Sequence, residues 1–167
     1  MLAGTLLGTA ATLYDRRNAV TIPSYGPESR GGASKSDIVI SDEPIEYPKV
    51  SQPNVLVITF QEAYEKYKLP RAKDCILLTD EDLVKLDDED KDIAWTIPAL
   101  RWAKEMGEER VFNMIMMGFV TAITDVVSAE AMKTAIRTRL RRLTELNLKA
   151  FDRGHKYGLS KLAERGG

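Results

Sequence analysis

The sequence contains one cysteine and one histidine among its 167 residues, and these shortages exclude several kinds of chemistry. A lone Cys75 cannot build a disulfide framework or ligate an iron–sulfur cluster within the chain. A lone His155 leaves too few ligands for a histidine-based metal site and no complete serine–histidine relay. No acid–base pair of side chains stands out either. We therefore predict no catalytic residues and no metal ligands in this chain.

The neighbours of these two residues predict where their side chains lie. Cys75 opens the apolar run 75–78, which is typical of a core residue in a protein from a reducing compartment. His155 lies in the polar segment 153–156, so we expect its ring to be solvated.

Long hydrophobic runs are also missing. The longest apolar stretch, 111–123, is interrupted by Asn113 and is shorter than the roughly 20 residues of a membrane-spanning helix. The apolar start, 1–8, lacks the basic residues and the cleavage site of a signal peptide. These features predict a cytoplasmic protein without a membrane partner.

Neither sign of charge is in excess. The chain has 24 Lys and Arg against 25 Asp and Glu, a net charge of −1. A nucleic-acid-binding protein normally shows a basic excess, so we expect no nucleic-acid partner. The near balance also leaves little repulsion between copies or between partners.

The apolar pattern alternates between strands and helices, and 167 residues are enough for one domain with a core. We expect helices at 2–13, 61–68, 98–106, 110–124 and 128–152, and strands at 19–23, 37–40, 54–59 and 75–79. The strand 54–59 is apolar enough to be buried on both faces. This order predicts an α/β domain of three layers over residues 1–167, with a mainly parallel sheet and a loose polar tail at 156–167.

Acidic residues are concentrated in the segment 80–92. A cation site is one interpretation, but the spacing does not match a calcium loop. We therefore expect a solvated excursion from the sheet.

The predicted helix 128–152 carries an apolar stripe on one side, with Asn147 as its polar exception. If Asn147 is buried, its amide needs a hydrogen-bond partner. Four arginines spread around the other side: Arg137, Arg139, Arg141 and Arg142. Their spread favours a solvated face or a protein interface over a phosphate site.

The loop 24–36 is the most unusual segment. Gly31 and Gly32 allow a backbone that approaches a ligand closely, and Arg30 offers a forked donor to an anion. These residues suit an anion or partner contact. The alternative is a rigid surface turn in which Pro27 sets φ and Arg30 pairs with Glu28. Taken alone, the residues slightly favour the turn.

Several separated stretches resemble the gamma subunit of the 2-oxoacid:ferredoxin oxidoreductases, over nearly all of residues 2–157. They are 24–34 (SYGPESRGGAS), 39–50 (VISDEPIEYPKV), 61–67 (QEAYEKY), Asn113 and Met114 with Gly118, and Asn147 with Ala150, Phe151 and Gly154. The stretches 39–50 and 61–67 are most similar to the 2-oxoglutarate branch.

The resemblance implies a Rossmann-like accessory subunit of a complex that decarboxylates a 2-oxoacid, forms an acyl-CoA and passes electrons to ferredoxin. It implies that thiamine diphosphate, Mg, iron–sulfur clusters and coenzyme A serve the holoenzyme, with no cofactor held by this chain alone. The implied partners are the alpha and beta thiamine-binding subunits, a ferredoxin-like delta subunit and ferredoxin as acceptor.

The resemblance also singles out a candidate binding site for coenzyme A or for another subunit. Its residues are Tyr25, Gly26, Arg30, Gly31 and Gly32. Two rival interpretations remain: the same subunit in a pyruvate or branched-chain 2-oxoacid enzyme, and a structural scaffold without ligand contact.

One departure from the family pattern concerns the start of the chain. The family normally begins with a strand and a glycine-rich turn before the helix placed at 2–13, and this sequence lacks both. A parallel sheet without a central strand would expose unpaired backbone groups. We therefore expect either a truncated start or a neighbouring element that fills the place.

Overall fold

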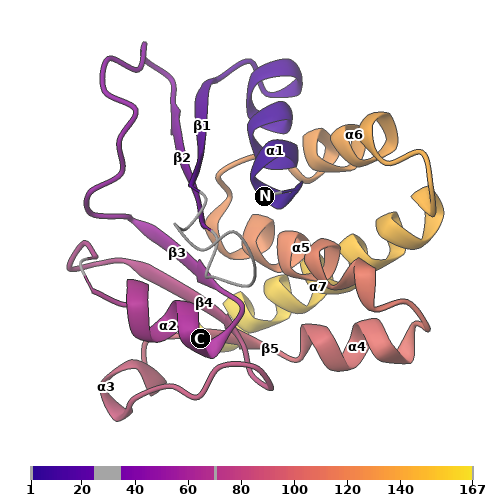
Figure 1. Cartoon of the computed structure of the whole chain (residues 1–167). Helices are drawn as coiled ribbons and strands as arrows, with labels where there is room; N and C mark the ends of the chain where they lie inside the picture. The colour runs from indigo at the N-terminus through magenta and orange to yellow at the C-terminus, as the bar shows by residue number, and fades with distance from the viewer. Residues whose placement is uncertain (1, 25–34, 70, 167) are drawn as a thin grey trace.

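The computed structural model describes residues 2–24, 35–69 and 71–166, and it has the strands and helices of an α/β fold (Figure 1). The strands are β1 (Asn18–Ser24), β2 (Lys35–Ser41), β3 (Val55–Ile58), β4 (Ile76–Asp80) and β5 (Trp95–Ile97). The helices are α1 (Leu2–Thr9), α2 (Gln61–Tyr67), α3 (Asp88–Lys91), α4 (Ala99–Glu105), α5 (Phe112–Thr124), α6 (Ala129–Arg139) and α7 (Thr144–Arg165). A π-helical turn, η1 (Ala10–Tyr14), continues α1, and a 3₁₀ turn, η2 (Glu109–Val111), precedes α5.

The strands form two sheets of opposite character. β3, β4 and β5 are parallel and lie in that order, which confirms the predicted parallel sheet. β1 and β2 form a separate antiparallel hairpin, paired from Asn18 opposite Ser41 to Ser24 opposite Lys35. Within the described residues no strand pairs with the outer edge of β3. The side chain of Val57 in β3 is 36% exposed, so the expectation of a strand buried on both faces is wrong.

Helices cover both faces of β4, which gives the three layers. Successive side chains of a strand point to opposite faces. Leu77 packs with Tyr64 of α2 in a small cluster on one side. Leu78, its neighbour, belongs to the main core on the other side, where α5 lies.

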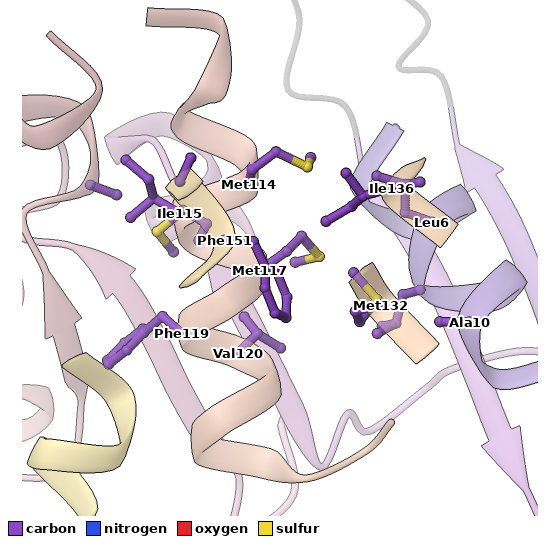
Figure 2. Packing of buried hydrophobic residues seen from close by; sticks show 14 of the residues in the cluster. Leu6, Ala10, Met114, Ile115, Met117, Phe119, Val120, Met132, Ile136 and Phe151 are labelled. Carbon is purple, nitrogen blue, oxygen red and sulfur yellow. The ribbon is translucent and has the colours of Figure 1, made fainter. Parts of the chain in front are cut away.

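The main core is built around α5, which is apolar almost all round because it is covered on every side. Met114 and Met117 of α5 face α1 and α6, where Leu6 and Ile136 meet them (Figure 2). The methionines of α5 therefore serve as core residues.

Two glycines allow α5 and α7 to lie side by side with their backbones in close contact (Figure 1). A Cβ on Gly118 would lie 2.0 Å from the carbonyl oxygen of Phe151, and a Cβ on Gly154 would lie 1.9 Å from that of Ile115. Phe151 itself is fully buried next to this contact. Any residue larger than glycine at positions 118 and 154 would therefore push the two helices apart.

The predicted long helix 128–152 is two helices. α6 ends at Arg139, and α7 begins at Thr144 after Leu143, whose backbone is left-handed with φ 57° and ψ 29°. A leucine in this conformation costs roughly 1–2 kcal/mol. Asn147 is buried, and its amide donates to the carbonyl oxygens of Arg142 (3.3 Å) and Leu143 (3.0 Å), which confirms the expected hydrogen-bond partner.

The helix α7 continues through residues where a loose tail was expected. Arg165 in its last turn lies over the ring of Trp95, 3.9 Å from the centroid. Its guanidinium also donates to the carbonyl oxygen of Ala94 at 2.7 Å. These contacts attach the end of α7 to the β5 region.

The acidic segment 80–92 is not a simple solvated excursion, because two of its carboxylates are buried. Asp80 is completely buried and accepts from the backbone N–H groups of Asp82 (2.9 Å), Leu83 (3.0 Å) and Leu100 (2.9 Å). It thereby joins the end of β4 to the first turn of α4.

The second buried carboxylate is Asp90, which is 3% exposed. Tyr64 donates to it at 2.6 Å, and the Arg71 guanidinium binds both its oxygens. The hydrogen bond from Arg71 lowers the pKa of Asp90. Burial, together with the hydrogen bond to Asp90, raises the pKa of Tyr64 to about 12. The network fixes α2 and α3 to each other.

Changing Gly154 to alanine tests the contact between α5 and α7. The added methyl would overlap the carbonyl group of Ile115, so the helices must separate. We expect Gly154→Ala to lower the free energy of unfolding by about 3 kcal/mol or more, measured by urea denaturation. Gly107→Ala is the comparison variant. A methyl group on Gly107 would enter open space, and any loss there comes from the backbone φ of 77°. A Gly154→Ala loss no larger than that of Gly107→Ala would contradict the close packing.

Protonating Asp90 should weaken the fold. Its pKa is lower in the folded chain than the value of about 3.9 in unfolded chains, so its stabilising contribution is present above about pH 4 and is lost as pH falls through the folded pKa. We expect Asp90→Asn to cost about 3 kcal/mol at neutral pH, because Arg71 loses its buried partner. The variant should also lose less stability between pH 5 and pH 3 than the parent chain. Asp74→Asn, at an exposed side chain, is the control; equal pH dependence in parent and Asp90→Asn would contradict this role.

Candidate functional site

The five residues that the sequence singled out lie outside the described residues. Tyr25, Gly26, Arg30, Gly31 and Gly32 all fall in the segment between β1 and β2. The structure does describe the hairpin on which this segment is carried. Its last described pair is Ser24 opposite Lys35.

Both ends of the described hairpin contact neighbouring elements. Lys35 forms an ion pair with Asp37 (2.9 Å) and lies 5.8 Å from the ring centroid of Tyr67 at the end of α2. At the other end, Arg17 pairs with Asp42 (2.7 Å) and donates to the carbonyl oxygen of Val126 (2.8 Å). The hairpin is therefore held at both ends of its described length.

A groove of about 570 Å³ runs along the hairpin between β1, α1 and the end of α6. Ligand-binding clefts usually fall within about 300–1,000 Å³. The lining residues are Thr5, Gly8, Thr9, Thr12, Leu13, Ala19, Thr21, Pro23, Ser36 and Arg139. Hydroxyl groups and one guanidinium thus supply its polar character.

Local sequence patterns explain how the groove forms. Ala19, Thr21 and Pro23 alternate along β1 and therefore share one face of the hairpin. α1 approaches this face closely, because a Cβ on Gly8 would lie only 2.7 Å from the hydroxyl oxygen of Thr21. Ser36, opposite Pro23 in the register, lies beneath Gly4 at the base of α1.

Two polar groups at the groove, those of Ser36 and Arg139, have no hydrogen-bond partner or only a distant one among the described residues. The hydroxyl oxygen of Ser36 is buried without a hydrogen-bond partner among the described residues. Arg139 donates to the Thr9 hydroxyl at 3.5 Å, which is at the long limit of a hydrogen bond. The guanidinium of Arg139 could therefore bind an anionic or carbonyl group, but the groove contains no nucleophile activated by a base.

Sequence reasoning missed the groove residues. Thr5, Thr9 and Thr12 recur at helical spacing on α1, and this was the available signal. The contribution of Arg139 could not be foreseen, because it depends on α6 packing beside α1.

The single histidine and cysteine are both partly buried. His155, expected to be solvated, stacks on Phe151 with ring centroids 5.8 Å apart, and burial lowers its pKa. Cys75, expected in the core, is only half-buried, and its pKa is raised by that burial. A thiol with a raised pKa is a poor nucleophile at neutral pH.

Two kinds of feature are missing from the described residues. In this part of the chain no group of three or more His, Cys, Asp or Glu side chains is arranged to hold a metal ion. Among the helices described, none combines the length and the apolar character needed to cross a membrane.

Comparison with known proteins gives consistent similarities over most of the chain. The family model for pyruvate ferredoxin/flavodoxin oxidoreductase matches residues 1–157. The 2-oxoglutarate synthase subunit KorC of Methanocaldococcus jannaschii is 47% identical over 160 residues, which cover 93% of this chain and 86% of that protein. The ketoisovalerate oxidoreductase subunit VorA of Methanothermobacter marburgensis is 30% identical over 156 residues, covering 91% of this chain and 33% of that protein.

A crystal structure shares the fold. The gamma subunit of a keto/oxoacid ferredoxin oxidoreductase from Geobacter sulfurreducens superposes with a TM-score of 0.81 at 38% identity. The match covers 95% of this chain and 90% of that one. The fold therefore agrees with the sequence similarities.

The raised pKa of Cys75 predicts slow alkylation. Because only the thiolate reacts, the native chain should react with iodoacetamide more slowly than an unperturbed thiol at pH 7.5, by about threefold or more. The alkylation rate of Cys75 should keep rising with pH after the rate of an unperturbed thiol has reached its plateau. Mass spectrometry of the time course, with urea-unfolded chain as the control, measures both. Equal rates in native and unfolded chain would contradict the pKa shift.

Proposed function

Because this chain belongs to the pyruvate ferredoxin/flavodoxin oxidoreductase family, we propose that it is the gamma subunit of a 2-oxoglutarate:ferredoxin oxidoreductase. The observation that carries the proposal is the 47% identity to a 2-oxoglutarate synthase subunit over 93% of this chain. The ketoisovalerate relative is 30% identical, and this favours 2-oxoglutarate over a branched-chain oxoacid.

The role proposed for the chain is non-catalytic. The groove offers hydroxyl groups and Arg139 for binding, whereas Cys75 and His155 have environments that suit neither a nucleophile nor a general base. Thiamine diphosphate, Mg and iron–sulfur clusters would then be held by alpha and beta subunits and a ferredoxin-like delta subunit. One cysteine cannot supply the ligands of a cluster. The same single cysteine suits a reducing cytoplasm.

The segment between β1 and β2 is the proposed contact with those subunits or with coenzyme A. The hairpin that carries it is tied to α2 through Lys35 and to the α5–α6 connection through Arg17. Both strands that flank the segment are therefore attached to the rest of the domain, which suits a contact surface. Arg30 would anchor a carboxylate or phosphate there.

Co-expression of the chain with its partner subunits tests the function. We expect a complex that reduces ferredoxin with 2-oxoglutarate and coenzyme A at a kcat/KM at least about tenfold above that for pyruvate or 2-ketoisovalerate. Preference for pyruvate or a branched-chain oxoacid would identify one of the rival enzymes. Failure of the chain to join any such complex would overturn the assignment.

Replacing Arg30 tests the loop. We expect Arg30→Ala to weaken assembly or to raise the apparent KM for coenzyme A by about tenfold, because a charge-assisted contact is lost. Arg16→Ala, at an arginine that the structure shows exposed, is the control and should change neither quantity. Unchanged assembly and kinetics in Arg30→Ala would remove Arg30 from the site. Coenzyme A titration that detects no contact with this chain would favour the scaffold interpretation.

A further inference from the structure

The α6–α7 turn, residues 137–143, concentrates positive charge that the rest of the structure leaves unbalanced. Arg137, Arg139, Arg141 and Arg142 are all exposed. Within the described parts of the chain, none of the four forms an ion pair. The whole chain has a net charge of −1, so this concentration is local.

Other arginines in the described residues are mostly engaged. Ion pairs hold Arg17, Arg71, Arg101, Arg110 and Arg153 to carboxylates. Arg165 lies over Trp95. The absence of partners around the α6–α7 turn is therefore a property of this surface and not of arginine in this protein generally.

The turn is held in a strained conformation. Leu143 is left-handed, with φ 57°, although leucine avoids that region. The Asn147 amide holds the carbonyl oxygens of Arg142 and Leu143, and the Thr144 hydroxyl donates to the carbonyl oxygen of Leu140 at 2.5 Å. Strain that the surroundings maintain in this way often marks a functional surface.

An exposed apolar side chain lies in the same turn. Leu143 is 46% exposed, directly after Arg141 and Arg142. An exposed leucine next to cations suits a protein interface, in which an apolar contact is surrounded by charge pairs.

We propose that the α6–α7 turn docks onto an acidic surface of another subunit of the complex, with Arg141 and Arg142 pairing with carboxylates and Leu143 making the apolar contact. The proposal rests on the proposed function, because that function supplies the partner subunits. The turn would give the chain a point of attachment to the complex.

A protein partner fits these observations better than a nucleic acid or a small anion. The near-neutral net charge of the chain is unlike that of a nucleic-acid-binding protein. A bound phosphate requires converging donors, whereas Arg139 points to the groove at Thr9 and the turn places Arg141 and Arg142 on an exposed surface. Carboxylates spread over a protein surface match donors that do not converge.

The test uses the co-expressed complex, purified by a tag on another subunit at a series of salt concentrations. Arg141→Glu combined with Arg142→Glu reverses the charge of the turn at exposed side chains, so the melting temperature should stay unchanged. We expect the amount of this chain retained at low salt to fall at least about tenfold. The difference from the parent should shrink as salt rises, because screening removes the attraction in the parent.

A matched pair of substitutions controls for total charge. Lys73→Glu combined with Lys85→Glu makes the same change at exposed lysines in the segments before and after β4, outside α6 and α7. This pair should leave retention unchanged. Leu143→Gly removes the apolar contact but retains a residue that accepts positive φ, so it should keep or raise the melting temperature while lowering retention.

Each remaining outcome counts against the proposal. Unchanged retention of the Arg141→Glu, Arg142→Glu chain, or an equal loss in the lysine control, would overturn it. The proposal would also be overturned if the arginine variant assembled normally but bound RNA or duplex DNA less well than the parent chain. If the parent chain itself fails to co-purify, the proposed function falls as well. If the parent complex is active and the arginine variant is fully retained, the docking proposal is rejected and the proposed function stands.

Discussion

The close contact between α5 and α7 is the constraint on which the rest of the structure depends. Gly118 and Gly154 let the two backbones approach until only a hydrogen atom fits between them. This approach buries Phe151 and leaves the other sides of α5 free to pack against α1, α6 and β4. A helix that is apolar almost all round is stable only when it is covered in this way.

From that centre, small and polar residues determine how the outer elements are attached. Gly8 allows α1 to approach the hairpin, and the groove lies alongside this approach. Asp80 and Asp90 hold the connections around β4 and α3 through buried hydrogen bonds. Asn147 does the same for the α6–α7 turn. Buried polar groups therefore specify the loops, while apolar burial supplies most of the stability.

The outer surfaces that result suit binding more than chemistry. The turn between α6 and α7 lies at the edge of the molecule (Figure 1), and its arginines are exposed. An attachment there would help to fix the position of the chain within a larger complex. Near-neutral net charge leaves such local patches as the source of electrostatic selectivity.

The alternation of strands and helices, a mainly parallel sheet that includes β3 and β4, and the shortage of reactive side chains could be predicted, because periodicity and residue type are local properties of the sequence. The short elements α3 and β5 were not predicted. Four features needed the tertiary structure: the antiparallel hairpin of β1 and β2, the break at Leu143, the burial of Asp90, and the groove at Arg139. Helical spacing continues through 140–143 without a glycine or proline to interrupt it. The side chains of Asn147 and Thr144 instead bond the carbonyl oxygens of the turn, in a conformation that the packing of α7 on α5 supports.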